Sequence, residues 1–269
     1  DRYNNPRTFS EGNGNIWRNI FDEGHPTEPI FNPDGTMSYS AVYSVGDLLY
    51  GKSHAVTIKD KFRNTLSGRM NFLDDRLRFN ADFTYRYRND NVTTKRVRTP
   101  YSRYKDVIET ISGVQSSFAE NTTRNSYIAT NVYVEYEDTF KDKHYFKTML
   151  GYNYEQSKNK GLYAYNDDLL TEDVQNINLA LGLENKNITG SWNRWRSVGV
   201  FSRLNYVFDE RYLLEIDARY DGSSKFNEGS QWELFTSGSA GWRMSQEPWF
   251  KVSKDVISNL KLRASYGSL

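Results

Sequence analysis

Paired carboxylates are the first groups in this sequence that could do chemistry. Glu135 and Glu137 stand two residues apart, and Glu215 and Asp217 repeat the spacing. Two carboxyl groups about 5 to 10 Å apart are what a glycoside hydrolase requires. Each pair, however, lies on a polar face that it shares with Asn, Lys and Arg. The pattern therefore favours a polar lining over a catalytic pair, and we predict no enzyme activity.

Metal-binding patterns are equally weak. His25, His54 and His144 are far apart in the sequence and show no ligand spacing. The stretch from Asn32 to Thr36 resembles part of a calcium loop, but Asp-Gly after Pro is more simply a turn. Cysteine is absent, which excludes disulfides and thiolate metal sites. We therefore predict neither a metal site nor any other cofactor.

Aromatic rings beside basic groups could bind a ligand without catalysing a reaction. Tyr163 and Tyr165 lie within a long polar segment, and Trp192 and Trp195 flank Arg194 at its end. Rings of this kind stack on sugar faces, and arginine pairs with anionic or hydroxyl-rich ligands. We expect these five residues to contact a ligand. The simpler alternative is that each ring only packs within a loop or a membrane girdle.

The elements that position these groups follow from composition and period. Aromatic residues make up 15% of the 269 residues, yet charged residues reach 26% and the mean hydropathy is -0.78. A membrane β-barrel combines these features, because it has a polar lumen, polar loops and aromatic girdles. No run approaches the roughly 20 apolar residues of a spanning helix. The net charge of +1 gives no global attraction for nucleic acid.

Strict alternation of apolar and polar residues is the strongest pattern. From Arg76 to Arg88, one face carries Leu77, Phe79, Ala81, Phe83, Tyr85 and Tyr87, and the other carries Arg76, Arg78, Asn80, Asp82, Thr84, Arg86 and Arg88. Successive side chains of a strand point to opposite faces, so this segment needs one apolar and one wet surface. Segments of about ten such residues have the length of a membrane-crossing strand.

The same alternation predicts about eight strands joined into hairpins. They are Phe62–Phe72, Arg76–Arg88, Ser126–Asp138, His144–Gln156, Trp195–Phe208, Arg211–Asp221, Glu233–Met244 and Ser258–Gly267. Short turns alternate with long polar loops at 89–125 and 157–194, as periplasmic turns and extracellular loops do in bacterial barrels. Residues 1–60 are predicted to be mostly extracellular loop with a possible strand, and 61–269 to be barrel hairpins. A small helix is expected around Pro248 to Val252.

The polar face of these strands is predicted to line the lumen of an all-β transmembrane barrel. The residues expected there are Arg78, Asp82, Arg86, Asn131, Glu135, Lys147, Glu215, Asp217 and Arg219. The chain starts without a secretion signal and ends on residues that read as a strand in progress. We therefore expect it to be part of a larger barrel.

One stretch carries a family resemblance. Arg219 to Phe226 (RYDGSSKF) resembles the SusC/RagA-like TonB-dependent transporters of Bacteroidetes outer membranes. Four nearby segments agree in order and spacing. They are Arg203 to Tyr206 (RLNY), Asp209 to Leu214 (DERYLL), Ser239 to Ser245 (SAGWRMS) and Asn259 to Gly267 (NLKLRASYG). The resemblance is specific from about Trp195 to Gly267 and looser before that.

The resemblance implies a 22-stranded barrel, an N-terminal plug that this stretch lacks, energy supplied through TonB, and a surface lipoprotein of the SusD type as lid. It implies uptake of a large nutrient across the outer membrane, with an oligosaccharide expected first and a peptide as the alternative. A structural or adhesive barrel without transport, and a soluble carbohydrate-active β-domain, are the competing hypotheses. No nucleic-acid partner is expected.

Overall fold

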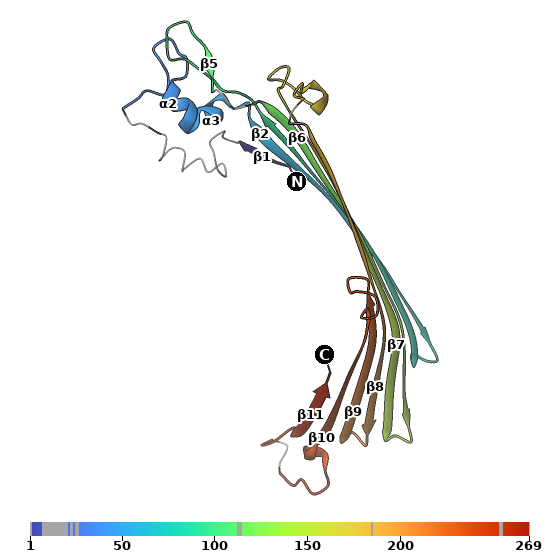
Figure 1. The fold of residues 1–269 in the computed structure, drawn as a ribbon. Coiled ribbons are helices and arrows are strands. Elements are labelled where there is room, and N and C mark those ends of the chain that lie inside the picture. Colours follow the sequence, from blue (N-terminus) through green and yellow to red (C-terminus); the bar gives the residue numbers. More distant parts are fainter. Residues whose placement is uncertain are drawn as a thin grey trace. The chain divides into compact units, whose positions relative to one another are not determined.

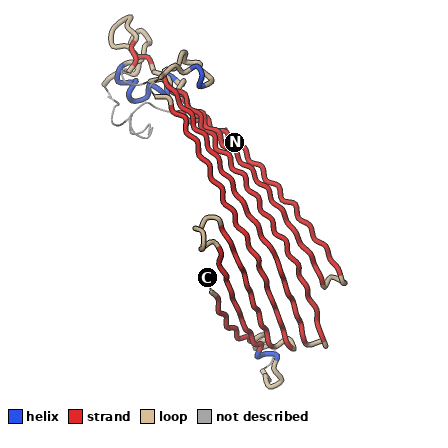
Figure 2. The backbone as a smooth tube through the Cα atoms, turned by 45° about the vertical axis from the view of Figure 1, so that its right-hand side comes forward, coloured by secondary structure: helices blue, strands red, loops and turns tan. Residues whose placement is uncertain are grey.

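A large antiparallel sheet dominates the computed structural model, which describes residues 2–6, 21, 24, 27–111, 115–183, 185–252 and 255–268. Nine strands pair in the order β1-β2-β3-β6-β7-β8-β9-β10-β11, so strands that follow one another along the chain lie side by side (Figures 1 and 2). The prediction of an all-β fold is confirmed. No helix among the described residues is long and apolar enough to cross a membrane.

The strands of the large sheet comprise seven of 12 to 24 residues and two short ones, β1 and β11, at its two edges. The large sheet contains β1 (Arg2–Pro6), β2 (His54–Phe72), β3 (Leu77–Arg96), β6 (Ser117–Phe140), β7 (His144–Asp167), β8 (Asn187–Phe208), β9 (Tyr212–Ser223), β10 (Trp232–Arg243) and β11 (Lys261–Gly267). A separate two-stranded sheet contains β4 (Pro100–Tyr101) and β5 (Glu109–Thr110). The short helices are α2 (Tyr39–Ala41), the π-helical η1 (Val42–Gly46), α3 (Asp47–Tyr50), and the 3₁₀ turns η2 (Ile177–Leu179) and η3 (Met244–Gln246).

Tight turns join β2 to β3, β6 to β7 and β8 to β9, as predicted. In the last of these, Asp209 and Glu210 have φ values of 50° and 54°. Two successive residues with positive φ suit the right-handed twist of a hairpin, and Asp is among the residues that tolerate this conformation. Short polar turns at these three positions hold neighbouring strands in register.

Several strands extend well into the predicted loops. β3 continues to Arg96 and β6 begins at Ser117, while β7 continues to Asp167 and β8 begins at Asn187. The connections that remain are 97–116 and 168–186, shorter than the predicted 89–125 and 157–194. The extra residues do not alternate strictly between apolar and polar, since Leu162, Tyr163, Ala164 and Tyr165 follow one another on β7. The strands continue because each one has an equally long neighbour to pair its backbone groups.

The predicted helix around Pro248 to Val252 is wrong. The helical turn is η3, and Glu247 after it has an extended backbone with φ -76° and ψ 144°. The ring of the following Pro248 disfavours a helical conformation at the residue before it. The short helix therefore ends before the proline.

Two compact units divide the chain. The loop unit is formed by Asp1–Lys61, Arg88–Asn125 and Asn159–Trp192, and the sheet unit by Phe62–Tyr87, Ser126–Lys158 and Asn193–Leu269. β2, β3, β6, β7 and β8 contribute residues to both. Within the loop unit, Met37, Ala41, Val42 and Tyr101 form a buried apolar cluster, with Tyr43 and Ile111 packed against it.

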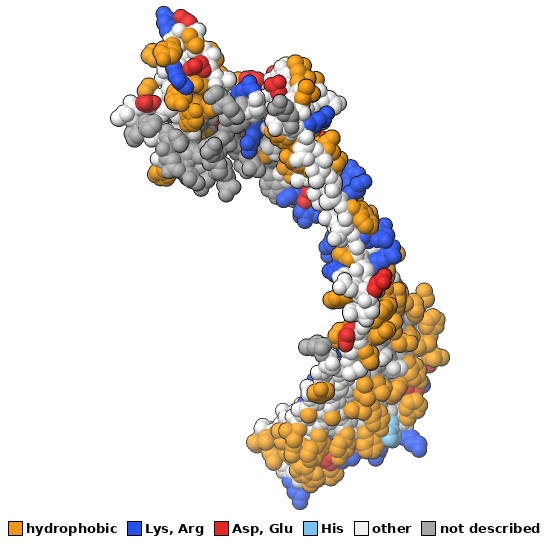
Figure 3. Space-filling view, in the orientation of Figure 1, with side chains coloured by type: hydrophobic (Ala, Val, Ile, Leu, Met, Phe, Trp, Pro, Cys, Tyr) orange, Lys and Arg blue, Asp and Glu red, His pale blue; other side chains and the backbone are white. Residues whose placement is uncertain are grey.

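The sheet unit has two faces of opposite character. On one face, Leu214 of β9 lies opposite Tyr206 and Ala240, and on the other face Glu215 lies opposite Asn205 and Ser239. The large apolar side chains of the first face are exposed. They include Phe62, Leu66, Met70, Phe79, Phe83, Leu150, Val200, Leu214, Ile216, Tyr220, Trp232, Leu234 and Leu262. Figure 3 shows hydrophobic side chains gathered over the part of the sheet that contains β7 to β11.

Candidate functional site: the polar face of the sheet unit

A four-residue ion cluster lies near the β2–β3 and β6–β7 turns. The guanidinium of Arg78 lies 3.5 Å from the carboxylate of Glu135 and 2.8 Å from that of Glu137. The ammonium of Lys147 on β7 lies 3.1 Å from Glu135 and 3.9 Å from Glu137. Two cations thus neutralise the paired carboxylates. This pairing of each acid with cations supports the lining interpretation of the pair.

A chain of amides crosses the same face further along the strands. The side-chain amide of Asn131 donates to Asp82 at 3.0 Å, and Asn153 of β7 donates to Asn131 at 2.6 Å. Three neighbouring strands therefore contribute one polar group each to a single network. Charged acceptors strengthen such bonds, so the network holds these side chains in fixed orientations.

A second charged group lies on β8, β9 and β11. Arg203 donates to Asp217 at 2.5 Å, and Arg219 donates to Asp221 at 2.6 and 2.8 Å. Arg263 of β11 lies 3.6 Å from Glu215. The pair Glu215 and Asp217, like the first pair, has arginine partners and no geometry that singles out one acid for catalysis.

An aromatic pair with two cations completes the face. The rings of Tyr127 and Trp195 are 6.4 Å apart, the guanidinium of Arg86 lies 4.7 Å from the Tyr127 ring, and the ammonium of Lys225 lies 4.3 Å from the Trp195 ring. Both rings are partly exposed. Cations over ring faces are attracted by the ring quadrupole. The arrangement offers both stacking surface and positive charge.

A glycine lets another ring lie across this face. A Cβ on Gly151 of β7 would come 2.2 Å from the ring of Phe201 and 2.8 Å from Cβ of Tyr133. Phe201 thus covers the backbone of the neighbouring strand, and Arg219 lies 5.8 Å from its ring centre. Only glycine leaves room for this close approach.

These contacts define the polar face, by which we mean the side of the sheet unit that carries all of these networks. Its residues are Arg78, Asp82, Arg86, Tyr127, Asn131, Tyr133, Glu135, Glu137, Lys147, Gly151, Asn153, Trp195, Phe201, Arg203, Glu215, Asp217, Arg219, Asp221 and Arg263, with Lys225 from the β9–β10 connection. All nine residues predicted to face the lumen are among them. That the face lines a lumen stays a prediction.

Several members of the polar face were missed by sequence reasoning. Glu137 was already placed on a polar face with Glu135, but Arg203 was not, although following the period of its strand would have found it. Tyr127 gives no such signal, because an aromatic ring at a polar position breaks the alternation. Lys225 lies outside any strand, so only the fold brings it to Trp195.

The five residues predicted to bind ligand do not form one cluster within either unit. Tyr163, Tyr165 and Trp192 belong to the loop unit, whereas Arg194 and Trp195 belong to the sheet unit. All five lie in β7 or β8 and not in a loop. The Trp192 side chain is 65% exposed, and the two tyrosines are partly buried. A role for them in ligand binding stays a prediction, which the contacts of Trp195 favour most.

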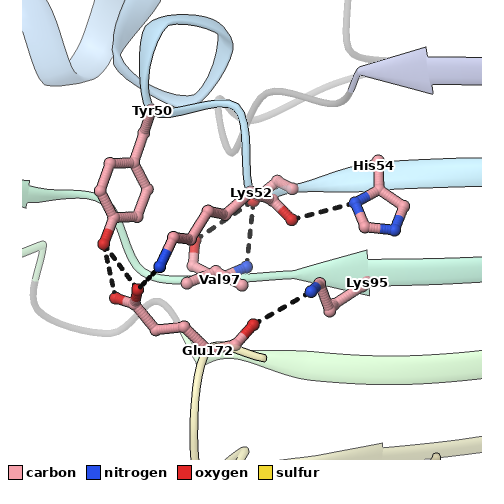
Figure 4. Close-up of polar contacts among 7 residues, drawn as sticks. Tyr50, Lys52, His54, Lys95, Val97 and Glu172 are labelled. Carbon is pink, nitrogen blue, oxygen red and sulfur yellow. Dashed lines mark hydrogen bonds and ion pairs between the residues drawn. The ribbon is translucent and has the colours of Figure 1, made fainter. Parts of the chain in front are cut away.

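In the loop unit, Glu172 connects three segments of the chain (Figure 4). Its carboxylate accepts from the Tyr50 hydroxyl at 2.7 Å and pairs with the Lys52 ammonium at 2.5 Å. Its backbone carbonyl accepts from Lys95 at 3.0 Å. Beside this group, the Ser53 hydroxyl and the backbone of Val97 exchange hydrogen bonds. The connection after β7 is thus tied to the start of β2 and the end of β3.

Burial and mutual hydrogen bonds shift the pKa values of Glu172, Lys52 and Tyr50. Burial alone raises the pKa of Glu172, but the hydrogen bonds from Lys52 and Tyr50 outweigh it and hold that pKa below its ordinary value. The hydrogen bond to Glu172 raises the pKa of Lys52. Burial and the same carboxylate raise the pKa of Tyr50. The ionised form of Glu172 is therefore the one that ties the segments together.

A ring cluster supports the helices of the loop unit. The rings of Tyr39 and Tyr43 are 5.0 Å apart, those of Tyr39 and Tyr101 are 5.3 Å apart, and the guanidinium of Arg103 lies 4.1 Å from the Tyr39 ring. The hydrogen bond with Tyr39, together with burial, raises the pKa of Tyr43 to about 12. These residues hold α2 and η1 against β4.

The described histidines have ordinary polar partners. His54 lies 3.1 Å from the Lys52 carbonyl, and His144 lies 2.8 Å from the Tyr206 hydroxyl, while His25 lies outside the described residues. Within the part of the chain that the structure describes, no three acids or histidines gather as metal ligands would. The stretch from Asn32 is a closed turn, in which Gly35 has a φ of 84° and its N–H donates to the Asn32 carbonyl.

The two faces define a class of protein. A sheet of tilted hairpin strands with large apolar side chains exposed on one face and charged networks on the other is the wall of a transmembrane β-barrel. Comparisons with known proteins extend this conclusion. No protein-family model matches the chain.

Related sequences and structures agree with one another. The chain is 29% identical to TonB-dependent receptor P3 of Formosa agariphila over 251 residues, which is 90% of this chain and 24% of the receptor. It is 41% identical to TonB-dependent receptor SusC of Bacteroides thetaiotaomicron over 70 residues, 26% of this chain and 7% of SusC. The RagAB peptide importer in its open-open state matches with a TM-score of 0.71 at 16% identity, over 88% of this chain and 26% of that one.

The chain is therefore similar in sequence to SusC and other TonB-dependent receptors of the outer membrane, and it shares the fold of the RagAB transporter. It spans about a quarter, 24%, of the length of TonB-dependent receptor P3. The resemblance noted in the sequence is confirmed. The structural match shows the shared fold alone, because its identity is only 16%.

Proposed function

We propose that this segment forms part of the wall of a transporter that takes up a large nutrient, first of all an oligosaccharide, across the outer membrane with energy delivered through TonB. The polar face would line the path of the ligand. A SusD-like surface lipoprotein would act as the lid, and connections such as 97–116 and 168–186 would meet it on the outside of the cell. The mechanism is binding and release, with no covalent step.

The observation that carries this proposal is the chemistry of the polar face. Asn131, Asn153 and Asp82 present amide and carboxylate groups, which hydrogen-bond to hydroxyls, and Trp195 and Tyr127 present ring surface, which stacks on sugar rings. A structural barrel would need none of these groups in such an arrangement. A soluble domain would not expose the apolar face.

Uptake by the full-length protein with its lid lipoprotein tests the proposal. Trp195→Ala should lower oligosaccharide uptake by roughly two- to tenfold, as expected for a stacking contact of about 0.5–1.5 kcal/mol. Trp232→Ala is a matched control, because Trp232 stacks on Tyr220 on the apolar face, with ring centres 5.0 Å apart. This control should leave uptake unchanged while the protein stays in the outer membrane.

A peptide is the second candidate ligand. The solved structures that share the fold are named RagAB peptide transporter and peptide importer, and the paired charges of the polar face could also hold peptide termini. Parallel uptake assays with oligosaccharides and with mixed short peptides separate the two. Uptake of peptides alone would replace the first ligand class, and uptake of neither would remove transport from the proposal.

A further inference from the structure

A groove with a volume of about 540 Å³ lies on the apolar face of β8 to β11. The side chains that line it on this face are Tyr206, Tyr212, Leu214, Ala240, Trp242, Leu262 and Ala264. With the tyrosine hydroxyls and the Trp242 indole as their only polar groups, these side chains suit a hydrocarbon and not a polar ligand.

Strand register explains why the face is hollow here. Ala240 of β10 lies between Leu214 of β9 and Ala264 of β11, and the next outward pair along β10 places Trp242 between Tyr212 and Leu262. Two alanines side by side form a low floor. The larger side chains of Leu214, Trp242 and Leu262 stand above this floor, so a depression forms over Ala240 and Ala264.

Aromatic side chains mark the level of the groove in the membrane. His144 lies 5.0 Å from Phe208, and Phe208 lies 6.2 Å from Tyr212, all on the apolar face next to the strand ends. The Tyr212 hydroxyl and the Trp242 indole N–H both donate to Glu247, at 2.8 and 2.9 Å. Rings with apolar bodies and polar tips are enriched where hydrocarbon meets water.

The groove therefore begins at an interface and runs into the hydrocarbon. It lies beside the tight β8–β9 turn, and tight turns are on the periplasmic side of bacterial barrels. The lipid that meets this side of an outer membrane is phospholipid, whereas lipopolysaccharide occupies the opposite leaflet. Because the groove is continuous with the exposed apolar face, an acyl chain reaches it without crossing any polar group.

We propose that this groove binds one acyl chain of a periplasmic-leaflet phospholipid, with its headgroup at the level of Tyr212 and Trp242. The site is separate from the polar face and does not depend on transport. It assigns a function to the pair Ala240 and Ala264, which neither the alternation pattern nor the proposed uptake explains. A bound chain fills space that side chains leave empty and packs against Leu214 and Leu262.

Native mass spectrometry of the full-length protein, extracted in a mild detergent and offered phospholipid or lipopolysaccharide, tests this site. Ala240→Phe with Ala264→Phe fills the groove with side chain. Retained phospholipid should fall by about tenfold or more, since several buried methylene contacts are lost. Ala81→Phe, on the apolar side of β3 and away from the groove, is the matched control and should retain as much phospholipid as the unmodified protein.

Three outcomes would overturn the proposal. Equal retention in the filled variant and the control would show that the groove holds no specific lipid. Preferential retention of lipopolysaccharide would place the groove in the other leaflet. A dimer that the filled variant disrupts would identify a second copy of the chain as the occupant. Because lipid retention is read without any nutrient, none of these outcomes depends on the proposed uptake.

Discussion

The loop unit and the sheet unit use apolar side chains in opposite ways. Every strongly buried apolar residue in the described part of the chain belongs to the loop unit, among them Met37, Tyr101, Phe118 and Val174. In the sheet unit, large side chains such as Leu66, at 72% exposed, lie on the surface. One unit therefore carries its apolar core within itself, and the other requires an apolar medium outside it.

This difference shows that the same strands place their apolar side chains according to two solvents, water and lipid. β2, β3, β6, β7 and β8 run through both units, and the buried apolar residues of these strands, Ala55 and Phe118, lie in the loop unit. Where water surrounds the chain, apolar groups must turn inward. Where lipid surrounds it, apolar groups can face outward, because lipid tails are as apolar as the side chains.

The largest test of this comparison truncates a phenylalanine in each unit. Phe118→Ala should lower the free energy of local unfolding by about 3–5 kcal/mol, because it leaves a cavity where the side chain was only 2% exposed. Phe83→Ala, at a site 45% exposed on the apolar face, should cost clearly less in a bilayer because lipid fills the space. Hydrogen exchange of the full-length protein in nanodiscs measures both, and equal losses would contradict the comparison.

A charge placed on either face of the sheet unit tests whether the apolar face contacts lipid and the polar face does not. Ile216→Arg puts a cation on the apolar face and should destabilise the folded barrel by about 2–4 kcal/mol in a bilayer. Asn205→Arg, directly opposite Glu215 on the polar face, should reduce stability little, because the new cation can pair with the Glu215 carboxylate. Urea unfolding in lipid vesicles compares the two variants. If both are tolerated equally, the assignment of the faces fails.

Alternation predicted the sheet unit far better than the loop unit. Arg78, Asp82 and Arg86 were assigned to one face from period alone, and their partners Asn131 and Glu135 lie on that face as well. A strand inside a membrane must keep strict alternation, so the face on which each side chain lies can be assigned from the sequence. The ends of β3, β6, β7 and β8 lack this strict alternation, and they could not be placed from the sequence.

Contacts between segments far apart in the chain could not be predicted from the sequence, for a different reason. Glu172 meets Tyr50 and Lys52, which lie 122 and 120 residues earlier in the chain. Nothing in the spacing of an acid, a tyrosine and a lysine specifies such a pairing, because only the complete sheet brings their strands together. The five residues predicted to contact a ligand are divided between the two units, with Trp192 in one and Trp195 in the other, and their role stays a prediction.

The smallest expected effect concerns the polar tie of the loop unit. Because the folded pKa of Glu172 is below its ordinary value, its ionised form stabilises the fold above the unfolded pKa, and this contribution is lost as pH falls through the folded pKa. Glu172→Gln removes the charge at every pH. We expect the connection after β7 to be more mobile in this variant at neutral pH, and the difference from the unmodified protein to vanish in acid.

A nitroxide label can report this loosening without disturbing the tie. Leu170→Cys provides a single attachment site on the chain, which has no cysteine, and the Leu170 side chain is 59% exposed. Label mobility should rise on acidification when Glu172 is present and should be high and independent of pH with Glu172→Gln. Glu120→Gln, an acid-to-amide change elsewhere in the loop unit, should behave as the unmodified chain. If the label mobility depends on neither pH nor Glu172, the apolar core alone positions this connection. The contrast between the two units would then be greater.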